Sequence, residues 1–151
     1  MERLGSPLPF LEVIEGLKQL KRAGWVKRGV PEPESVNDHM YRMVWFCLAH
    51  PELKSEDENA SILMCLMHDI GEAIAGDITP SDGIDAGGEQ YQRIRDTFLI
   101  LTETKHTREK LGVKFLSILL SRSNPYWASR ILEIWDDYEK GETRVAKLAI
   151  K

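Results

Sequence analysis

The sequence predicts an all-α fold, a compact bundle of helices, from three observations. Hydrophobic residues recur at intervals of three and four along most of the chain, as they do on the buried face of a helix. No stretch alternates polar and apolar residues with the period of two that marks a half-buried strand. The length of 151 residues and the hydrophobic content of 42% suit one globular domain with a substantial core. We therefore expect a single domain over residues 1–151.

The first part of the chain predicts two helices. Residues 10–20 carry one apolar stripe at helical spacing. Glycines then interrupt the pattern, and two prolines favour an extended approach to the next helix. Ser35 is the expected N-cap of that helix, with Asp38 three residues later as its capping-box partner. The second helix is expected to end at His50, before a proline.

The rest of the chain predicts further helices around one glycine-rich loop. A third helix is expected to start near Ser55, with acidic residues in its first turn. It continues through Ile62–Met67, which is apolar on every side and is therefore expected to be central and buried. Residues 76–88 are predicted as a loop. Further apolar stripes predict helices around residues 91–101, 111–119 and 127–138, and a last one beginning near residue 142.

Composition excludes several classes of function. A formal net charge of -4 argues against a broad basic surface that follows a nucleic-acid polymer. The apolar run Ile62–Met67 is far shorter than the roughly 20 residues that span a bilayer. Residues 1–9 lack the apolar core of a signal peptide, so we expect a cytoplasmic protein without membrane partners. Cys47 and Cys65 lie in apolar stretches, as reduced core thiols do.

A set of polar residues following the most hydrophobic run is a candidate metal site. His68, Asp69 and Glu72 stand at spacings of three and four that share a helix face. His68 and Asp69 differ by about 100° around a helix, so both reach one cation only near a helix end. A buried imidazole and two carboxylates cost free energy unless paired, and a divalent cation satisfies both ligand types. His39 is a candidate ligand from a neighbouring helix, and Asp77 follows on a glycine-flanked turn.

The order of these residues resembles a known superfamily. His39 followed by the His68-Asp69 pair is similar to the pattern of the HD-domain metal-dependent phosphohydrolases. The stretches PESVNDHMYRM, MHDIGEAIAGDITPSD and IWDDYEKGET resemble its 5'-deoxynucleotidase family, and GWVKRGV fits the opening segment of that family. The resemblance covers residues 8–95 and 126–149, whereas residues 97–124 diverge. It implies an HD-domain helical bundle that releases phosphate from 5'-deoxyribonucleoside monophosphates.

The resemblance also implies roles for individual residues. The implied ligands of the first metal are His39, His68 and Asp69. The resemblance implies that Glu72 activates water or holds a second metal. Asp77 would bind substrate or the second metal, with help from the backbone of Ile78. Trp25 and Arg28 would face the substrate. Arg28 would contact phosphate through its planar guanidinium group. Glu72 and Asp77 are thus the expected catalytic residues.

The expected cofactor is a divalent metal cation. Two imidazoles with carboxylate oxygens do not select sharply among manganese, cobalt, magnesium and zinc, although imidazole argues against magnesium alone at the first site. The expected partner is a small nucleotide substrate rather than a nucleic-acid polymer. The resemblance implies a homodimer for full-length relatives.

One expected ligand has no counterpart in the sequence. The family places a further Asp after a segment like residues 142–151, and no Asp follows here. We therefore expect a bundle without its last helices, one more open coordination position, weaker metal binding and an exposed apolar groove. Two alternatives stay open: an inactive or weakly metal-binding fragment with a regulatory or interaction role, and an HD phosphohydrolase that acts on another nucleotide. His106, flanked by polar residues, is expected at the surface.

Overall fold

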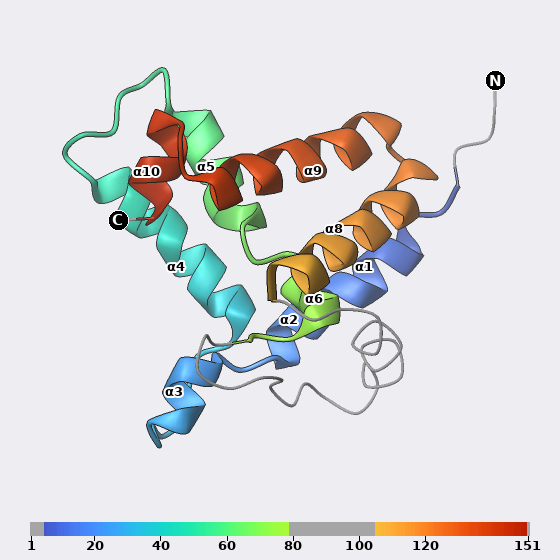
Figure 1. Ribbon diagram of the computed structural model, residues 1–151, viewed down its shortest axis with the longest axis horizontal. Helices are drawn as coiled ribbons and strands as arrows, with labels where there is room; N and C mark the ends of the chain where they lie inside the picture. The colour runs from blue at the N-terminus through green and yellow to red at the C-terminus, as the bar shows by residue number, and fades with distance from the viewer. Residues whose placement is uncertain (1–4, 79–104, 151) are drawn as a thin grey trace.

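The regular structure is helical, as the sequence predicts (Figure 1). The computed structural model describes residues 5–78 and 105–150, and within these ranges the one β-type pairing is an isolated bridge between Lys21 and Ser35. The helices are α1 (Leu8–Ile14), α2 (Gly16–Gln19), α3 (Ala23–Lys27), α4 (Val36–Ala49), α5 (Glu58–Met67), α6 (Glu72–Ala75), α8 (Lys105–Ser121), α9 (Pro125–Lys140) and α10 (Arg144–Ile150). The helix predicted at residues 91–101 and most of the loop predicted at residues 76–88 lie outside the described residues.

The helix expected over residues 10–20 is divided into α1 and α2 at Glu15. After α2 the backbone becomes extended and pairs with the residues before α4: the Arg22 N–H donates to the Glu34 carbonyl oxygen at 3.0 Å. The short helix α3 follows, which the sequence did not predict. Its first residue, Ala23, donates its N–H to the carboxylate of Asp77 at 2.7 Å, so the side chain that supports this helix end comes from 54 residues away.

Helix α4 begins where its local sequence predicts. The Ser35 hydroxyl accepts the Asp38 N–H at 3.1 Å, and the Asp38 carboxylate accepts the Ser35 N–H at 3.1 Å, which completes the predicted capping box. His50 is the C-cap, as expected. This firm start matters for the site, because it sets the position of His39 in the first turn of α4.

Helix α5 differs from its prediction in two respects. It starts at Glu58 rather than near Ser55, because the preceding residues form turns. It is also not buried on every side: Met64 and Cys65 are buried, but Leu66 is 41% exposed. Part of this apolar run is therefore exposed, because the described helices around α5 do not cover all of its sides.

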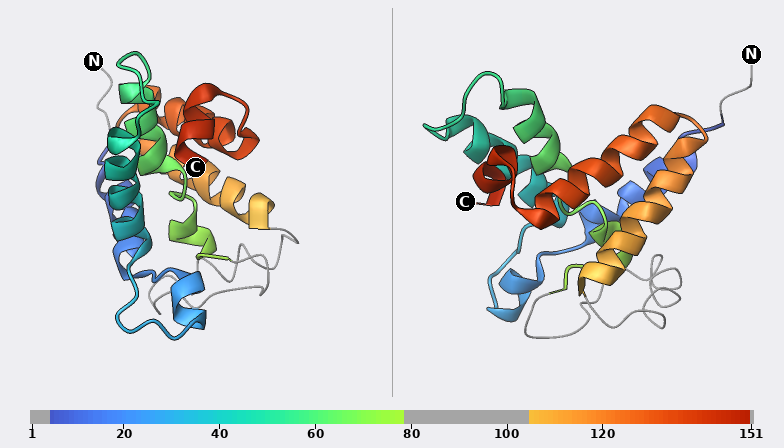
Figure 2. Two further views of the ribbon diagram at one scale, coloured as in Figure 1. Left: turned by 90° about the vertical axis from the view of Figure 1, so that its left-hand side faces the viewer. Right: turned by 45° about the horizontal axis from the view of Figure 1, so that its top comes forward.

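Helices α8 and α9 form an antiparallel hairpin that organises the core (Figure 2). Helix α9 contributes to two hydrophobic clusters. Ile131 and Trp135 pack with residues of α1, α2, α4, α6 and α8, whereas Ile134 packs with residues of α4, α5 and α10. Leu116 of α8 is fully buried in the first cluster. Fully burying such a side chain contributes about 1.5 to 3 kcal/mol.

The surface agrees with three further expectations. None of the described helices is long and apolar enough to span a bilayer. A largely apolar groove runs along α4 and α10, lined in part by Met43, Phe46, Leu148 and Ile150. His106 lies at the surface, as predicted, with its Nδ1 atom 2.7 Å from the carboxylate of Glu139.

Candidate metal centre

The His68-Asp69 pair lies on the turn between α5 and α6. Helix α5 ends at Met67, and His68 is its C-cap. The turn lies directly against α8 through two glycines: a Cβ atom on Gly71 would lie 2.6 Å from the Glu109 carbonyl oxygen, and one on Gly112 would lie 2.5 Å from the Gly71 carbonyl oxygen. Larger residues at either position would force the backbones apart. This close approach fixes the turn on the core.

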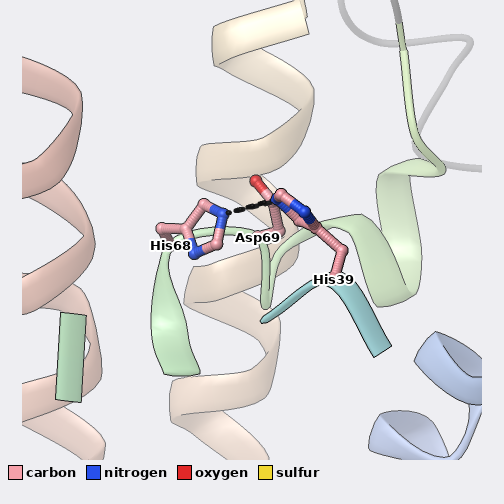
Figure 3. A group of neighbouring side chains, drawn as sticks. All are labelled: His39, His68 and Asp69. Carbon is pink, nitrogen blue, oxygen red and sulfur yellow. Dashed lines mark hydrogen bonds and ion pairs between the residues drawn. The ribbon is translucent and has the colours of Figure 1, made fainter. Parts of the chain in front are cut away.

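His39, His68 and Asp69, here called the HD cluster, converge from two parts of the chain (Figure 3). The Nε2 atom of His68 lies 3.0 Å from Oδ2 of Asp69 and 3.4 Å from Nε2 of His39. The Nε2 atom of His39 lies 3.6 Å from the same Asp69 oxygen. Ligands bound to one metal at about 2.0 to 2.2 Å lie about 3 to 3.5 Å apart. The spacing in the HD cluster therefore fits a single cation.

The hydrogen bonding of His68 supports this interpretation. Its Nδ1 atom lies 2.9 Å from the Cys65 carbonyl oxygen, which can only accept a hydrogen bond. We assign the ring proton to Nδ1 on this basis, which leaves Nε2 of the neutral ring as a lone-pair donor facing Asp69. A hydrogen bond of this kind orients the histidine ligands of metal sites.

The protonation states of the HD cluster also suit a metal. Burial, and after it the nearby charge of Arg22, lower the pKa of His39 to about 4, so the ring is neutral at pH 7. Burial raises the pKa of Asp69, but the close contact with His68 and the positive charge of Arg22 outweigh burial and hold that pKa below its ordinary value. A neutral imidazole and an ionised carboxylate are the forms that bind divalent cations.

Glu72 and Asp77 lie next to the HD cluster. Both carboxylate oxygens of Glu72 are buried and accept no hydrogen bond within the described residues. Burial, together with the charges of Asp69, Asp77 and Glu109, raises the pKa of Glu72 well above its ordinary value. Asp77 is 5% exposed and holds the start of α3. A buried acid without hydrogen bonds is an expected feature of a functional site.

The sequence reasoning missed Arg22, the cation of this site. Its Nη1 atom lies 3.1 Å from Oδ2 of Asp69, 3.6 Å from Oδ2 of Asp77 and 3.9 Å from Oε2 of Glu72. Arg22 reaches these acids because the extended pairing before α3 places it beside α4 and the turn after α5. No local pattern distinguishes Arg22 from other basic residues. The buried acids alone indicated that some cation must lie near them.

A pocket beside the HD cluster carries the predicted substrate-facing residues. It is lined by Arg22, Gly24, Trp25, Arg28, Glu34, His39, Arg42 and Asp77. The Trp25 indole N–H donates to Glu34 at 3.1 Å, and the Arg28 guanidinium donates to the Gly24 carbonyl oxygen at 3.1 Å. Arg42, which the sequence reasoning did not select, donates to Glu34 at 2.7 Å. Its spacing of three from His39 on α4 was the available signal.

The remaining predicted position is Ile78. It is 6% exposed and is the last described residue before the gap at residues 79–104. Among the described residues, the group that meets the geometry of a metal site contains the HD cluster alone. The assignment of Glu72, Asp77 and the Ile78 backbone as further ligands stays a prediction.

Comparisons with known proteins place the chain in a family. A family model described as HD domain matches residues 14–151. The chain is 37% identical over 152 residues to 5'-deoxynucleotidase HDDC2 of Dictyostelium discoideum, which covers 96% of this chain and 70% of that protein. It is 33% identical over 142 residues to 5'-deoxynucleotidase HDDC2 of Homo sapiens, which covers 94% of this chain and 60% of the relative. For 5'-deoxynucleotidase YGK1 of Saccharomyces cerevisiae the identity is 38% over 134 residues, with coverage of 88% and 54%.

Solved structures share the fold. A protein from Magnetospirillum magnetotacticum, described as a predicted metal-dependent phosphohydrolase, superposes with a TM-score of 0.65 at 22% identity, covering 94% of this chain and 62% of that one. A conserved hypothetical protein from Pyrococcus furiosus gives a TM-score of 0.58 at 24% identity, with coverage of 95% and 70%. The chain spans 54 to 70% of the length of the three curated relatives named above. Since the family model covers most of the chain and the described residues form the His–His-Asp cluster, the chain belongs to the HD-domain family.

Proposed function

We propose that this chain is a metal-dependent phosphomonoesterase that releases phosphate from 5'-deoxyribonucleoside monophosphates. The observation that carries the proposal is the HD cluster, which opens beside a pocket lined by three arginines, Arg22, Arg28 and Arg42. A cation and several guanidinium groups together suit a phosphate dianion. The names of relatives at 33 to 38% identity support the substrate class.

The HD cluster would hold one divalent cation, with manganese, cobalt, magnesium or zinc as candidates. When bound, such a cation polarises a phosphoryl oxygen and lowers the pKa of water. The two imidazoles favour manganese, cobalt or zinc over magnesium at this position. As the alternative to the direct roles given below, Glu72 and Asp77, with help from the Ile78 backbone, would hold a second cation that activates the water.

Glu72 is the proposed general base. Its buried carboxyl has no hydrogen bond within the described residues, and its raised pKa makes it a stronger proton acceptor than an ordinary glutamate. It would take a proton at a carboxylate oxygen from the attacking water. Bases whose pKa lies closer to the working pH are the more effective ones.

The remaining residues would orient the substrate. Arg22 lies within 3.9 Å of three acids, so it can hold a phosphate oxygen while it also positions those acids. Arg28 is the proposed second phosphate contact, and Trp25, 42% exposed at the pocket, offers a face for stacking. Asp77 is proposed to accept a sugar hydroxyl. A pocket that leaves a 2'-hydroxyl unpaired would produce the deoxy preference.

A second candidate function is that of an interaction module. The observation that favours it is the apolar groove along α4 and α10, where Phe46 is 65% exposed and Ile150 is 55% exposed. Such a groove suits a helical partner segment. A single domain, a cytoplasmic location and a homodimer remain predictions of the sequence.

Phosphate release from dAMP and from AMP tests the proposal. The purified chain is incubated with each nucleotide in manganese, in cobalt and in EDTA. His68→Ala removes one ligand of the HD cluster, and His50→Ala is the matched control, because His50 lies at the far end of the same helix as His39. Release that requires metal, is faster with dAMP and is lost only in His68→Ala is expected. Metal binding without release from any nucleotide would contradict the proposal and favour the interaction module.

A further inference from the structure

Glu34 lines the pocket beside the HD cluster and has no role in the proposed reaction. Its backbone is fixed from both sides. The Glu34 carbonyl oxygen accepts the Arg22 N–H at 3.0 Å, and the next residue, Ser35, is the N-cap of α4. The Glu34 side chain is 16% exposed. The chain therefore holds this carboxylate at a defined place in the pocket wall.

One oxygen atom of Glu34 joins two other residues of the same pocket. Its Oε1 atom accepts the Trp25 indole N–H at 3.1 Å and a guanidinium N–H of Arg42 at 2.7 Å. A carboxylate oxygen has two lone pairs, so it can accept both hydrogen bonds at once. Trp25 lies on α3 and Arg42 on α4, so contacts within one helix do not set their relative positions. Glu34 is the shared acceptor that does.

Trp25 and Arg42 need a partner to keep one conformation. Trp25 is 42% exposed, and the Arg42 side chain is half-exposed. Long side chains with that much freedom occupy several rotamers unless a contact orders them. Arg42 also lies over the Phe46 ring, 5.8 Å from its centroid, and lines both the pocket and the apolar groove. The bond to Glu34 therefore holds Arg42 at the boundary that the pocket shares with the groove.

The distance from Glu34 to His39 separates this contact from metal binding. The Oε1 atom of Glu34 lies 4.0 Å from Nδ1 of His39, which is too long for a hydrogen bond. The same oxygen lies well within hydrogen-bond range of Trp25 and Arg42. We therefore expect Glu34 to act on the pocket wall and to leave the orientation of the metal ligand unchanged.

From these contacts we propose that Glu34 is a positioning residue that sets substrate specificity: it holds Trp25 and Arg42 together as the wall that receives the base of the nucleotide. The inference rests on the proposed function. An indole and a guanidinium are planar groups on which nucleobases stack. A sugar phosphate without a base gains nothing from such a wall. Glu34 acts through Trp25 and Arg42, so its loss should weaken binding of the nucleotide and spare the chemical step.

Steady-state kinetics in cobalt on two substrates test the proposal. One is dAMP, and the other is 2-deoxyribose 5-phosphate, which has the same sugar and phosphate without the base. Glu34→Ala should lower kcat/KM for dAMP about tenfold through a higher KM, with kcat within about threefold. Its kcat/KM for 2-deoxyribose 5-phosphate should stay within about twofold of the unmutated chain.

Three further variants sharpen the test. Glu34→Gln should recover most of the preference for dAMP, because its amide oxygen can accept both N–H groups. Trp25→Phe removes one of these hydrogen bonds from the donor side and keeps an aromatic face. It should lower the preference about threefold, and it carries the test if Glu34→Ala does not fold. Glu133→Ala is the matched control: it breaks an Arg130–Glu133 pair at 2.6 Å on the surface of α9 and should change either kcat/KM less than about twofold.

Cobalt titration separates the wall from the metal site. The cobalt affinity of Glu34→Ala should stay within about threefold of the unmutated chain. Equal losses on both substrates, or a weaker affinity for cobalt, would overturn the inference, because Glu34 would then act on the metal site or on the whole fold. A preference for dAMP that Glu34→Ala changes by less than about twofold would overturn it as well. An unmutated chain that releases phosphate from neither substrate would instead refute the proposed function, and this role with it.

Discussion

Replacing the Glu109 carboxyl by an amide should make the chain more stable at neutral pH and leave it nearly unchanged at acid pH. Burial raises the pKa of Glu109 from 4.5 to about 7, an effect that the charge of Lys105 only partly offsets. The folded chain therefore holds a proton on Glu109 at pH values where the unfolded chain has released it. Stability from this group is fully present below pH 4.5, falls as the pH rises toward 7, and is lost above that value.

The magnitude follows from the size of the shift. Each pKa unit corresponds to about 1.4 kcal/mol, so the full cost of ionised Glu109 is about 3 kcal/mol. Between pH 5 and pH 8 the difference in unfolding free energy, Glu109→Gln minus unmutated chain, should rise by about 2 to 3 kcal/mol. His39 titrates in both proteins, so its contribution largely cancels in this difference. The charge of Glu109 helps to raise the pKa of Glu72, so its loss changes the difference in the same direction.

Urea unfolding followed by circular dichroism in EDTA measures this difference at pH 5, 6, 7 and 8. Asp136→Asn is the control, because its carboxylate is more than a third exposed and pairs with Lys110 at the surface. A difference for Glu109→Gln that stays constant within about 0.5 kcal/mol, or that grows toward acid pH, would refute the reasoning. It would mean that the Glu109 carboxyl is solvated or fully neutralised in the folded chain.

Three further predictions concern the cap, the core and the metal. Ser35→Ala removes the capping box of α4 and should lower the unfolding free energy by about 1 kcal/mol, measured by urea unfolding, with Ser129→Ala on exposed α9 surface as the control. Leu116→Ala should lower it by about 2 to 5 kcal/mol, since the side chain is fully buried, and a loss below about 1 kcal/mol would contradict that packing. Cobalt at 100 times its dissociation constant should stabilise the chain by about 2.7 kcal/mol in thermal unfolding, and a shift that persists in His68→Ala would place the cation elsewhere.

Local interactions account for what the sequence predicted well. The start of α4 depends on two hydrogen bonds between residues three apart, so Ser35 and Asp38 suffice to predict it. The helical class follows from the spacing of apolar residues, which each helix needs in order to bury one face. The identities of His39, His68 and Asp69 pointed to a metal, because these groups are costly to bury without one.

Long-range contacts account for what the sequence did not reveal. Helix α3 depends on a carboxylate 54 residues away, and Arg22 meets Asp69 across 47 residues. Glu109 becomes a buried acid only because Gly71 and Gly112 let α8 approach the metal turn. None of these contacts has a local signature, since each depends on which surfaces the packed helices bring together.

The sequence by itself therefore determined the helical class, the longer helices α4, α5, α8 and α9, the cap of α4 and the chemical type of the metal ligands. Only the tertiary structure decided which cations balance the acids and which acids become buried. The physical reason is range: helix propensity and capping act within about four residues, whereas burial and charge balance act between segments that are distant in the chain. The HD cluster depends on both the sequence and the tertiary structure. The sequence supplies the ligands, and the packing of α4 against α5 brings them within reach of one cation.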